Sequence, residues 1–291
     1  CFNDDIQGTG SVVLAGLLAA MRGLDRRLSD QRIVFFGAGS ASVGIADMIC
    51  SGMADESKLS LEEARTRVWM VDSKGLVSRR RDGKLQEHKL PYARDDKPAN
   101  NLLEVVKRVK PTVLIGASGQ PGSFDEAVIN EMAKTCDRPV VFALSNPTSK
   151  SECSAEQAYR WTRGKAIFAS GSPFAPVRLE GRIFVPGQGN NMFIFPGIGL
   201  GAIASGSQRV TDGMFFTAAK TLAQMVTEEE LEAGTLYPDL GKIRQISLAI
   251  ATSVCRLAWD QGLAQYEQPD DIREYVRSCM WHPNYRPYVA A

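Results

Sequence analysis

Short, uniformly apolar runs alternate with amphipathic segments through the first part of the chain. Each run ends at a small or polar residue, as expected for buried strands of a parallel sheet. The expected strands are 32–36, 68–71, 112–115, 139–144 and 166–169. Segments of helical character lie before and between them, at 11–21, 42–51, 60–65, 100–109 and 125–134. This alternation predicts an α/β protein with a doubly wound parallel (Rossmann-type) sheet, whose strands all end at one common edge.

The tail of the chain has a helical period instead. An apolar residue recurs every three or four positions, which predicts one stripe of a long amphipathic helix. The stripe is Ile243, Ile246, Ile250, Val254 and Leu257. Further helices are expected at 212–226 and 270–280. We therefore expect the sheet domain to cover 1–210, including an N-terminal helix, and additional C-terminal helices over 211–291 to pack on it.

One stretch fits neither pattern. Residues 183–208 carry no charge, and Pro186, Pro196 and several glycines interrupt them. We interpret this stretch as buried loops with one short helix. Another apolar run, 12–21, is too short for a membrane-spanning helix, which needs roughly 20 residues, so no membrane partner is expected.

Composition narrows the classes of partner. Hydrophobic residues make up 44% of the chain and charged residues 23%, and the formal net charge is +1. The first two values are typical of a globular protein. Because there is no excess of positive charge, nucleic acid is not an expected partner.

Cysteine spacing and the first residues also bear on the class of protein. The six cysteines are far apart and form no Cys-x-x-Cys pair, so neither a disulfide scaffold nor a structural zinc site is indicated. The chain starts at Cys1, and no basic segment followed by an apolar one marks a signal peptide. We interpret the sequence as a piece of a longer protein.

A glycine-rich turn follows the first expected strand. Gly37-Ala38-Gly39 comes directly after the apolar run, and Ser40 and Ala41 lead into a helix. In such a turn the glycines let the backbone approach a pyrophosphate, which binds at the helix N-terminus. The third position of the usual fingerprint is Ser42 rather than glycine, so a plain strand–turn–helix is the alternative. The context favours a dinucleotide-binding domain.

The end of the second strand indicates which dinucleotide. A carboxylate there, Asp72, is placed to accept hydrogen bonds from the adenosine ribose, which alone would favour NAD. Ser73 and Lys74 follow it and would suit a 2′-phosphate. Lys89 lies downstream in a basic segment that also contains Arg79, Arg80, Arg81 and Lys84. Most of this basic segment is expected to be solvated, with one or two of its side chains reaching the phosphate. Ser73 and Lys74 favour NADP over NAD.

Two further groups of polar residues are ambiguous when taken alone. Asp4 and Asp5 precede the first helix, where one could bind a hard cation; adjacent acidic residues before a helix also complement its dipole. Asn146, Asn190 and Asn191 follow expected strands or loops. Asparagine is common in turns, so their position does not by itself assign them to a site.

Together these segments resemble malic enzyme, of the NADP-dependent type, over essentially the whole chain. The segments that carry the resemblance, in matching order, are 2–9, 37–39, 71–76, 142–148 (Phe-Ala-Leu-Ser-Asn-Pro-Thr), 168–174 and 186–191 (Pro-Gly-Gln-Gly-Asn-Asn). The resemblance implies oxidative decarboxylation of L-malate to pyruvate and CO₂, with NADP or NAD and with Mg²⁺ or Mn²⁺. This chain would be the C-terminal, cofactor-binding portion.

The resemblance also implies residue roles. Asp5 would be a metal ligand, and Asp4 its hydrogen-bonding neighbour, which holds a catalytic lysine. Lys89, which precedes Pro91-Tyr92 as a lysine does in NADP-using members, would contact the 2′-phosphate and strengthen the preference for NADP. Asn146 and Asn190 would contact the cofactor, and both of them, with Asn191, would line the malate pocket. The family's catalytic tyrosine and lysine and two more acidic ligands would lie upstream of Cys1, so the isolated chain is expected to be inactive.

The same resemblance implies a homo-oligomer, dimer or tetramer, in the full-length protein, located in the cytoplasm or mitochondria. Two alternatives remain at this point. One is another amino- or hydroxy-acid dehydrogenase with a similar cofactor domain. The other is a stand-alone NAD(P)-binding or regulatory module without catalysis.

Overall fold

A seven-stranded sheet forms the centre of the computed structural model, which describes residues 1–282. Its strand order is β3-β2-β1-β4-β5-β6-β9, and all neighbours are parallel except β3 and β2. The strands are β1 (Ile33–Phe36), β2 (Val68–Asp72), β3 (Gly75–Leu76), β4 (Val113–Gly116), β5 (Val140–Ala143), β6 (Ile167–Ser170) and β9 (Gly187–Gln188). The order reverses between β1 and β4, which is where open sheets of this kind bind ligands.

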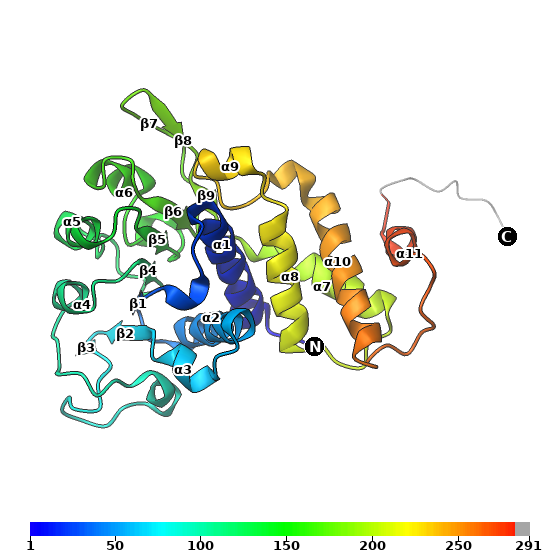
Figure 1. Cartoon of the computed structure of the whole chain (residues 1–291), viewed down its shortest axis with the longest axis horizontal. Coiled ribbons are helices and arrows are strands. Elements are labelled where there is room, and N and C mark those ends of the chain that lie inside the picture. Colours follow the sequence, from blue (N-terminus) through cyan, green and yellow to red (C-terminus); the bar gives the residue numbers. More distant parts are fainter. Residues whose placement is uncertain (283–291) are drawn as a thin grey trace.

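Side chains of the central strands alternate between two helical layers. In β1, Ile33 and Phe35 belong to one buried cluster and Val34 to the other. The strands need no polar face because both faces are covered, which explains why their sequences are uniformly apolar. The doubly wound α/β architecture expected from the sequence is confirmed (Figure 1).

Helices cover the sheet on both sides. One layer contains α1 (Thr9–Leu24) and α2 (Ser40–Ser57), and the other contains α4 (Leu102–Val109), α5 (Glu126–Thr135) and α6 (Ala155–Trp161). Short α3 (Leu61–Arg65) begins with the capping box that Ser60 and Glu63 predict: the Glu63 N–H donates to Ser60 Oγ at 3.2 Å.

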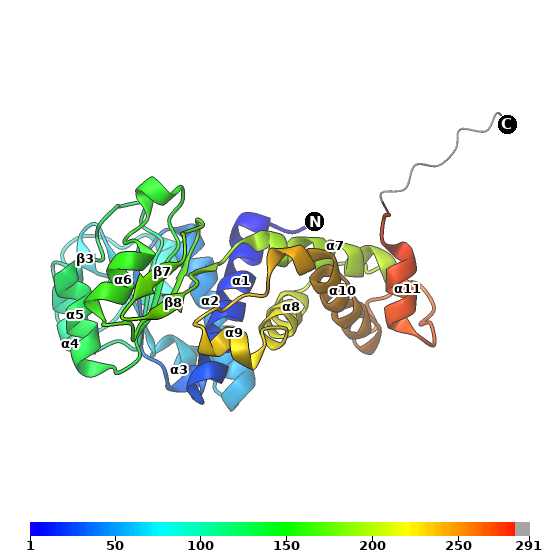
Figure 2. The same ribbon diagram turned by 90° about the horizontal axis from the view of Figure 1, so that it is seen from above.

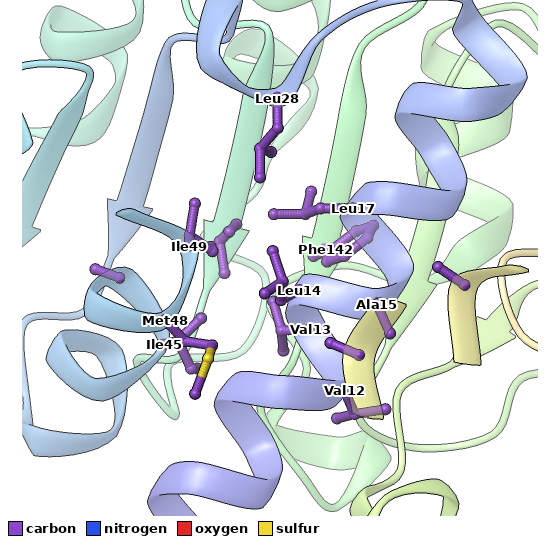
Figure 3. Close-up of a cluster of buried hydrophobic side chains, with 14 of the residues drawn as sticks. Val12, Val13, Leu14, Ala15, Leu17, Leu28, Ile45, Met48, Ile49 and Phe142 are labelled. Atoms are coloured by element: carbon purple, nitrogen blue, oxygen red, sulfur yellow. The ribbon is translucent and has the colours of Figure 1, made fainter. Parts of the chain in front are cut away.

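Helix α1 lies at the centre of the molecule. Figure 3 shows Leu14 and Leu17 of this helix packed with Ile45 and Ile49 of α2 and with Phe142 of β5. Both leucines are fully buried, and each such burial stabilises the fold by about 1.5–3 kcal/mol. An all-apolar helix is stable here because partners surround it.

The tail helices, except α11 (Ile272–Cys279), pack against the same core; residues 283–291 of the expected C-terminal part lie outside the described residues. The tail helices are α7 (Phe195–Ala204), α8 (Asp212–Gln224), α9 (Glu228–Glu232), α10 (Ile243–Asp260) and α11. Ser11 Oγ of α1 donates to the Phe215 carbonyl of α8 at 2.7 Å, and Tyr237 Oη donates to the Val12 carbonyl at 3.0 Å. Figure 2 shows α10 and α11 extending away from the sheet, where they form a small cluster of their own with α7.

The interpretation of residues 183–208 was wrong in part. Strand β8 (Arg182–Phe184) pairs with β7 (Val177–Leu179) in a hairpin that projects from the body (Figure 1), and Ile183 is 55% exposed. The turn residues Glu180 and Gly181 both have positive φ, at 50° and 78°, as a two-residue hairpin requires. Strand β9 then joins the sheet beside β6, and only α7 matches the expected short helix.

Two further observations concern the described residues as a whole. No helix within residues 1–282 is long and apolar enough to cross a membrane. All six cysteines are free thiols; Cys1 and Cys279 are exposed and the other four are buried.

Candidate dinucleotide and substrate site

The glycine turn after β1 is shaped to leave backbone accessible. Gly37 has φ of 114°, and a Cβ there would lie 2.4 Å from the Ala117 carbonyl oxygen, so only glycine fits. At Gly39 a Cβ would meet nothing within 4 Å. No side chain caps the N-terminus of α2, so its first N–H groups can bind an anion.

The turn forms one side of a cleft of about 340 Å³ at the carboxyl edge of β1, β2 and β4. The predicted cofactor residues that line it are Gly37, Ala38, Gly39, Ser40, Asp72, Ser73 and Lys89. Ala41 and Lys74 do not line it, although each adjoins a residue that does. The lining residues that sequence reasoning did not single out include Gln86, His88, Ser118 and Gln120.

At the β2 end of the cleft, one carboxylate binds two cations. The Arg81 guanidinium donates to both oxygens of Asp72, each at 2.8 Å, and Lys89 Nζ donates to Oδ2 at 2.8 Å. The Lys74 N–H donates to Oδ1 at 2.9 Å. Burial by itself would raise the pKa of Asp72, but the hydrogen bonds from Arg81 and Lys89 outweigh it and hold this pKa well below its usual range.

The Asp72 cluster (Asp72, Arg81 and Lys89) is therefore positive despite its carboxylate. All three side chains are about one-tenth exposed, at 10–12%, so their charges are only partly screened. The sequence does not distinguish Arg81 from Arg79 and Arg80, because the three arginines are adjacent. Only the fold separates them: Arg79 and Arg80 are exposed, whereas Arg81 is partly buried. A ribose contact by Asp72 stays a prediction.

The predicted asparagines lie at the same sheet edge, beyond β5 and β9. Asn146 is exposed and precedes a cis peptide bond to Pro147. Asn190 Oδ1 accepts the Met192 N–H at 3.0 Å, so this side chain already caps a turn. The structure thus brings these residues to the cofactor edge without placing them in the cleft lining itself.

Asp4 and Asn191 meet although 187 residues separate them. Asn191 Nδ2 donates to Asp4 Oδ2 at 2.5 Å. The other oxygen, Oδ1, is buried without a hydrogen-bond partner in the described part of the chain, and it lies where a Cβ on Gly8 would come within 2.0 Å. Burial, and then the nearby Asp5 charge, raise the pKa of Asp4.

Asp5 is exposed. An exposed carboxylate suits a hard divalent cation chemically, but one ligand is not a site. Within residues 1–282, no group of three His, Cys, Asp or Glu side chains is arranged to hold a metal ion. The metal role of Asp5 therefore stays a prediction.

Comparison with known proteins decides the family. The family model described as "Malic enzyme, NAD binding domain" matches residues 6–259. The chain belongs to the malic enzyme family. It is 53% identical over 287 residues to an NADP-dependent malic enzyme of Dictyostelium discoideum, covering 98% of this chain and 53% of that protein. The corresponding enzyme of Phaseolus vulgaris is 51% identical, with 99% and 49% covered.

Solved malic enzymes share the fold. The structures from Entamoeba histolytica and Pyrococcus horikoshii each have a TM-score of 0.74 and 25% identity over 96% of this chain, and the match covers 53% and 59% of them. The chain thus spans about half the length of the curated malic enzymes it matches. What it contains is the nicotinamide-dinucleotide-binding domain of the family.

Proposed function

We propose that this chain is the cofactor-binding part of an enzyme that oxidatively decarboxylates L-malate to pyruvate and CO₂ with NADP as the preferred acceptor. The observation that carries the proposal is one cleft that joins an open glycine turn to a positive cluster at the end of β2. The names of the relatives, NADP-dependent malic enzyme, support the same activity.

The residues of the cleft fit an NADP molecule. The pyrophosphate would bind the N–H groups at the start of α2, and the adenosine would lie over β2. Lys89 and Arg81 are two cations against one carboxylate, so a 2′-phosphate would add the missing negative charge. A hydrogen bond between charged groups contributes about 1.5–3 kcal/mol, which corresponds to roughly a tenfold to hundredfold gain in affinity.

The residues near Asp4 fit the malate end of the same reaction. Asp5 would hold Mg²⁺ or Mn²⁺, which when bound polarises the oxygen of the 2-hydroxy acid. The unpaired Asp4 Oδ1 suits an ammonium donor, in agreement with the lysine that the family resemblance implies. Asn191 fixes the second Asp4 oxygen, while Asn146 and Asn190 would orient nicotinamide and malate.

Two further properties of the full-length protein are proposals: its oligomeric state and its location in the cell. A dimer or tetramer is expected from the resemblance. The cytoplasmic or mitochondrial location stays a prediction, since four of the relatives are named chloroplastic.

Isothermal titration of the 291-residue chain with NADP and NAD tests the cofactor assignment. We expect NADP to bind at least tenfold more tightly than NAD. Adenosine 2′,5′-bisphosphate, which carries only the adenosine half and its phosphates, should bind as well. Equal affinity for the two dinucleotides, or tighter binding of NAD, would contradict the assignment.

A further inference from the structure

Glu152 is a carboxylate that is completely buried beneath the cofactor edge. It lies between Lys150 and α6, and its exposed fraction is 0%. In the part of the chain that the structure describes, no Lys, Arg or His lies within 4 Å of it as an ion-pair partner. Gly116 makes room for it, because a Cβ there would lie 2.5 Å from Glu152 Cδ. Burial of a carboxylate is costly unless hydrogen bonds replace its water.

Those hydrogen bonds come from two different loops. Oε1 accepts from the Ser118 N–H at 3.0 Å, from Ser118 Oγ at 2.9 Å and from Ser145 Oγ at 2.6 Å. Oε2 accepts from the Ser145 N–H at 3.4 Å. Ser145 Oγ also accepts the Gly119 N–H at 2.8 Å, which closes the network. One side chain therefore joins the loop after β4 to the loop after β5.

The loop after β4 lines the half of the cleft that lies away from the Asp72 cluster, and the loop after β5 lies next to it, outside the lining. Ser118 lines the cleft, and Asn146 directly follows Ser145. A dinucleotide crosses the point where strand order reverses, so when its adenosine lies over β2 its nicotinamide lies over β4 and β5. The Glu152 network is therefore built under the nicotinamide half.

We propose that Glu152 is a positioning residue for the nicotinamide half of the cofactor. It does not line the cleft itself and acts by holding Ser118 and Asn146 at a fixed separation. Glutamine is a poor replacement, because its NH₂ group would face donors in either orientation: the Ser145 N–H at the Oε2 position, or the Ser118 and Ser145 donors at the Oε1 position. This inference rests on the proposed function.

Binding of two ligands by the Glu152→Gln chain tests the proposal. NADP spans both halves of the cleft, whereas adenosine 2′,5′-bisphosphate occupies only the adenosine half. We expect NADP affinity to fall about tenfold to hundredfold, with bisphosphate affinity unchanged within about twofold. Equal loss for both ligands would show a general structural role and overturn the proposal, as would no loss for either.

Controls separate this proposal from the function on which it depends. If the unaltered chain binds neither ligand, the proposed function itself fails. Glu56→Gln is the control for the same change of side chain at an exposed position: Glu56 accepts the Leu28 and Ser29 N–H groups at 3.2 and 3.0 Å, before β1 and so at the opposite sheet edge. It should leave both affinities unchanged.

A second variant keeps the test available if Glu152→Gln does not fold. Ser145→Ala removes the hydroxyl that links Gly119 to Glu152. The buried Glu152 carboxylate keeps its hydrogen bonds from Ser118 in this variant. The variant should show the same split between the two ligands, with a smaller loss for NADP. A parallel loss for the bisphosphate would count against the inference.

Discussion

Residue-scale chemistry at the end of β2 depends on which cation reaches Asp72. Asp72 itself could be predicted, because a carboxylate after the second strand has a recognisable place in the sequence. Arg81 could not, because three successive arginines give no signal of which one folds inward. Glu152 is a similar case, since Ser118 lies 34 residues away from it and no local pattern reports that contact. In both cases tertiary packing, rather than a local sequence pattern, determines which side chain makes the contact.

Lys89→Ala tests the cofactor preference in the full-length protein. Loss of the ammonium should lower the ratio of kcat/KM for NADP to that for NAD by about tenfold or more, because one charge-assisted contact to the 2′-phosphate disappears. Steady-state kinetics with both cofactors provides the ratio. Lys84→Ala, in an exposed position of the same segment, should not change it. An unchanged ratio in Lys89→Ala would place this lysine outside the phosphate site.

Asp72→Asn tests the electrostatic role of the cluster through pH. The folded-state pKa of Asp72 lies below its unfolded value of about 3.9, so its ion pairs stabilise the fold above about pH 4 and lose this effect as the pH falls toward the folded-state pKa. The difference in free energy of unfolding between wild type and variant should therefore shrink below about pH 4. Urea denaturation at several pH values measures it; a difference independent of pH would contradict the assignment.

Element-scale prediction succeeded where burial imposed a uniform pattern. Strands β1, β4 and β5 are covered on both faces, so their apolar runs could be recognised directly. The β7–β8 hairpin is exposed and only three residues long on each side, which leaves no alternation long enough to detect. Helix α2 extends to Ser57, beyond the predicted end at residue 51, because Met53 is also buried in the core.

The short helical segment Glu87–Tyr92 carries both His88 and Lys89 to the cleft, and Tyr92 anchors it. The Tyr92 hydroxyl donates to Asp47 Oδ1 of α2 at 2.7 Å. Tyr92→Phe leaves Asp47 one donor fewer, which should cost about 1–3 kcal/mol of unfolding free energy. It should also weaken NADP binding severalfold, because Lys89 is less well held.

Urea denaturation and calorimetric titration check both effects of Tyr92→Phe. Tyr159→Phe is the control, because the Tyr159 hydroxyl is buried without a hydrogen-bond partner among residues 1–282. Its removal should be neutral or stabilising. If the two variants behave alike, Tyr92 only fills space in the core.

At the scale of the whole molecule, the described residues contain a cofactor cleft and, at Asp5, the single exposed carboxylate to which we assign a metal role as a prediction. Hard divalent cations usually take several oxygen ligands from the protein and water. The extent of the family match could be predicted from motif order, whereas the exposure of Asp5 required the structure.

The isolated chain should therefore bind NADP but turn over little or no malate. A steady-state assay with malate, Mn²⁺ and NADP tests this, alongside the titrations that show an intact cofactor site. Turnover within about tenfold of an ordinary enzyme rate of about 10 s⁻¹ would overturn the prediction. Binding without turnover would agree with it.

The central position of α1 has a consequence for biosynthesis. Two of the residues that hydrogen-bond it, Phe215 and Tyr237, are 204 and 225 residues further along the chain. Domains fold as they are synthesised on the ribosome. This almost wholly apolar helix therefore cannot be fully buried until α8 and Tyr237 have emerged. Nascent chains arrested before α8 should accordingly expose α1 to chaperones, and release should follow once α8 has been translated.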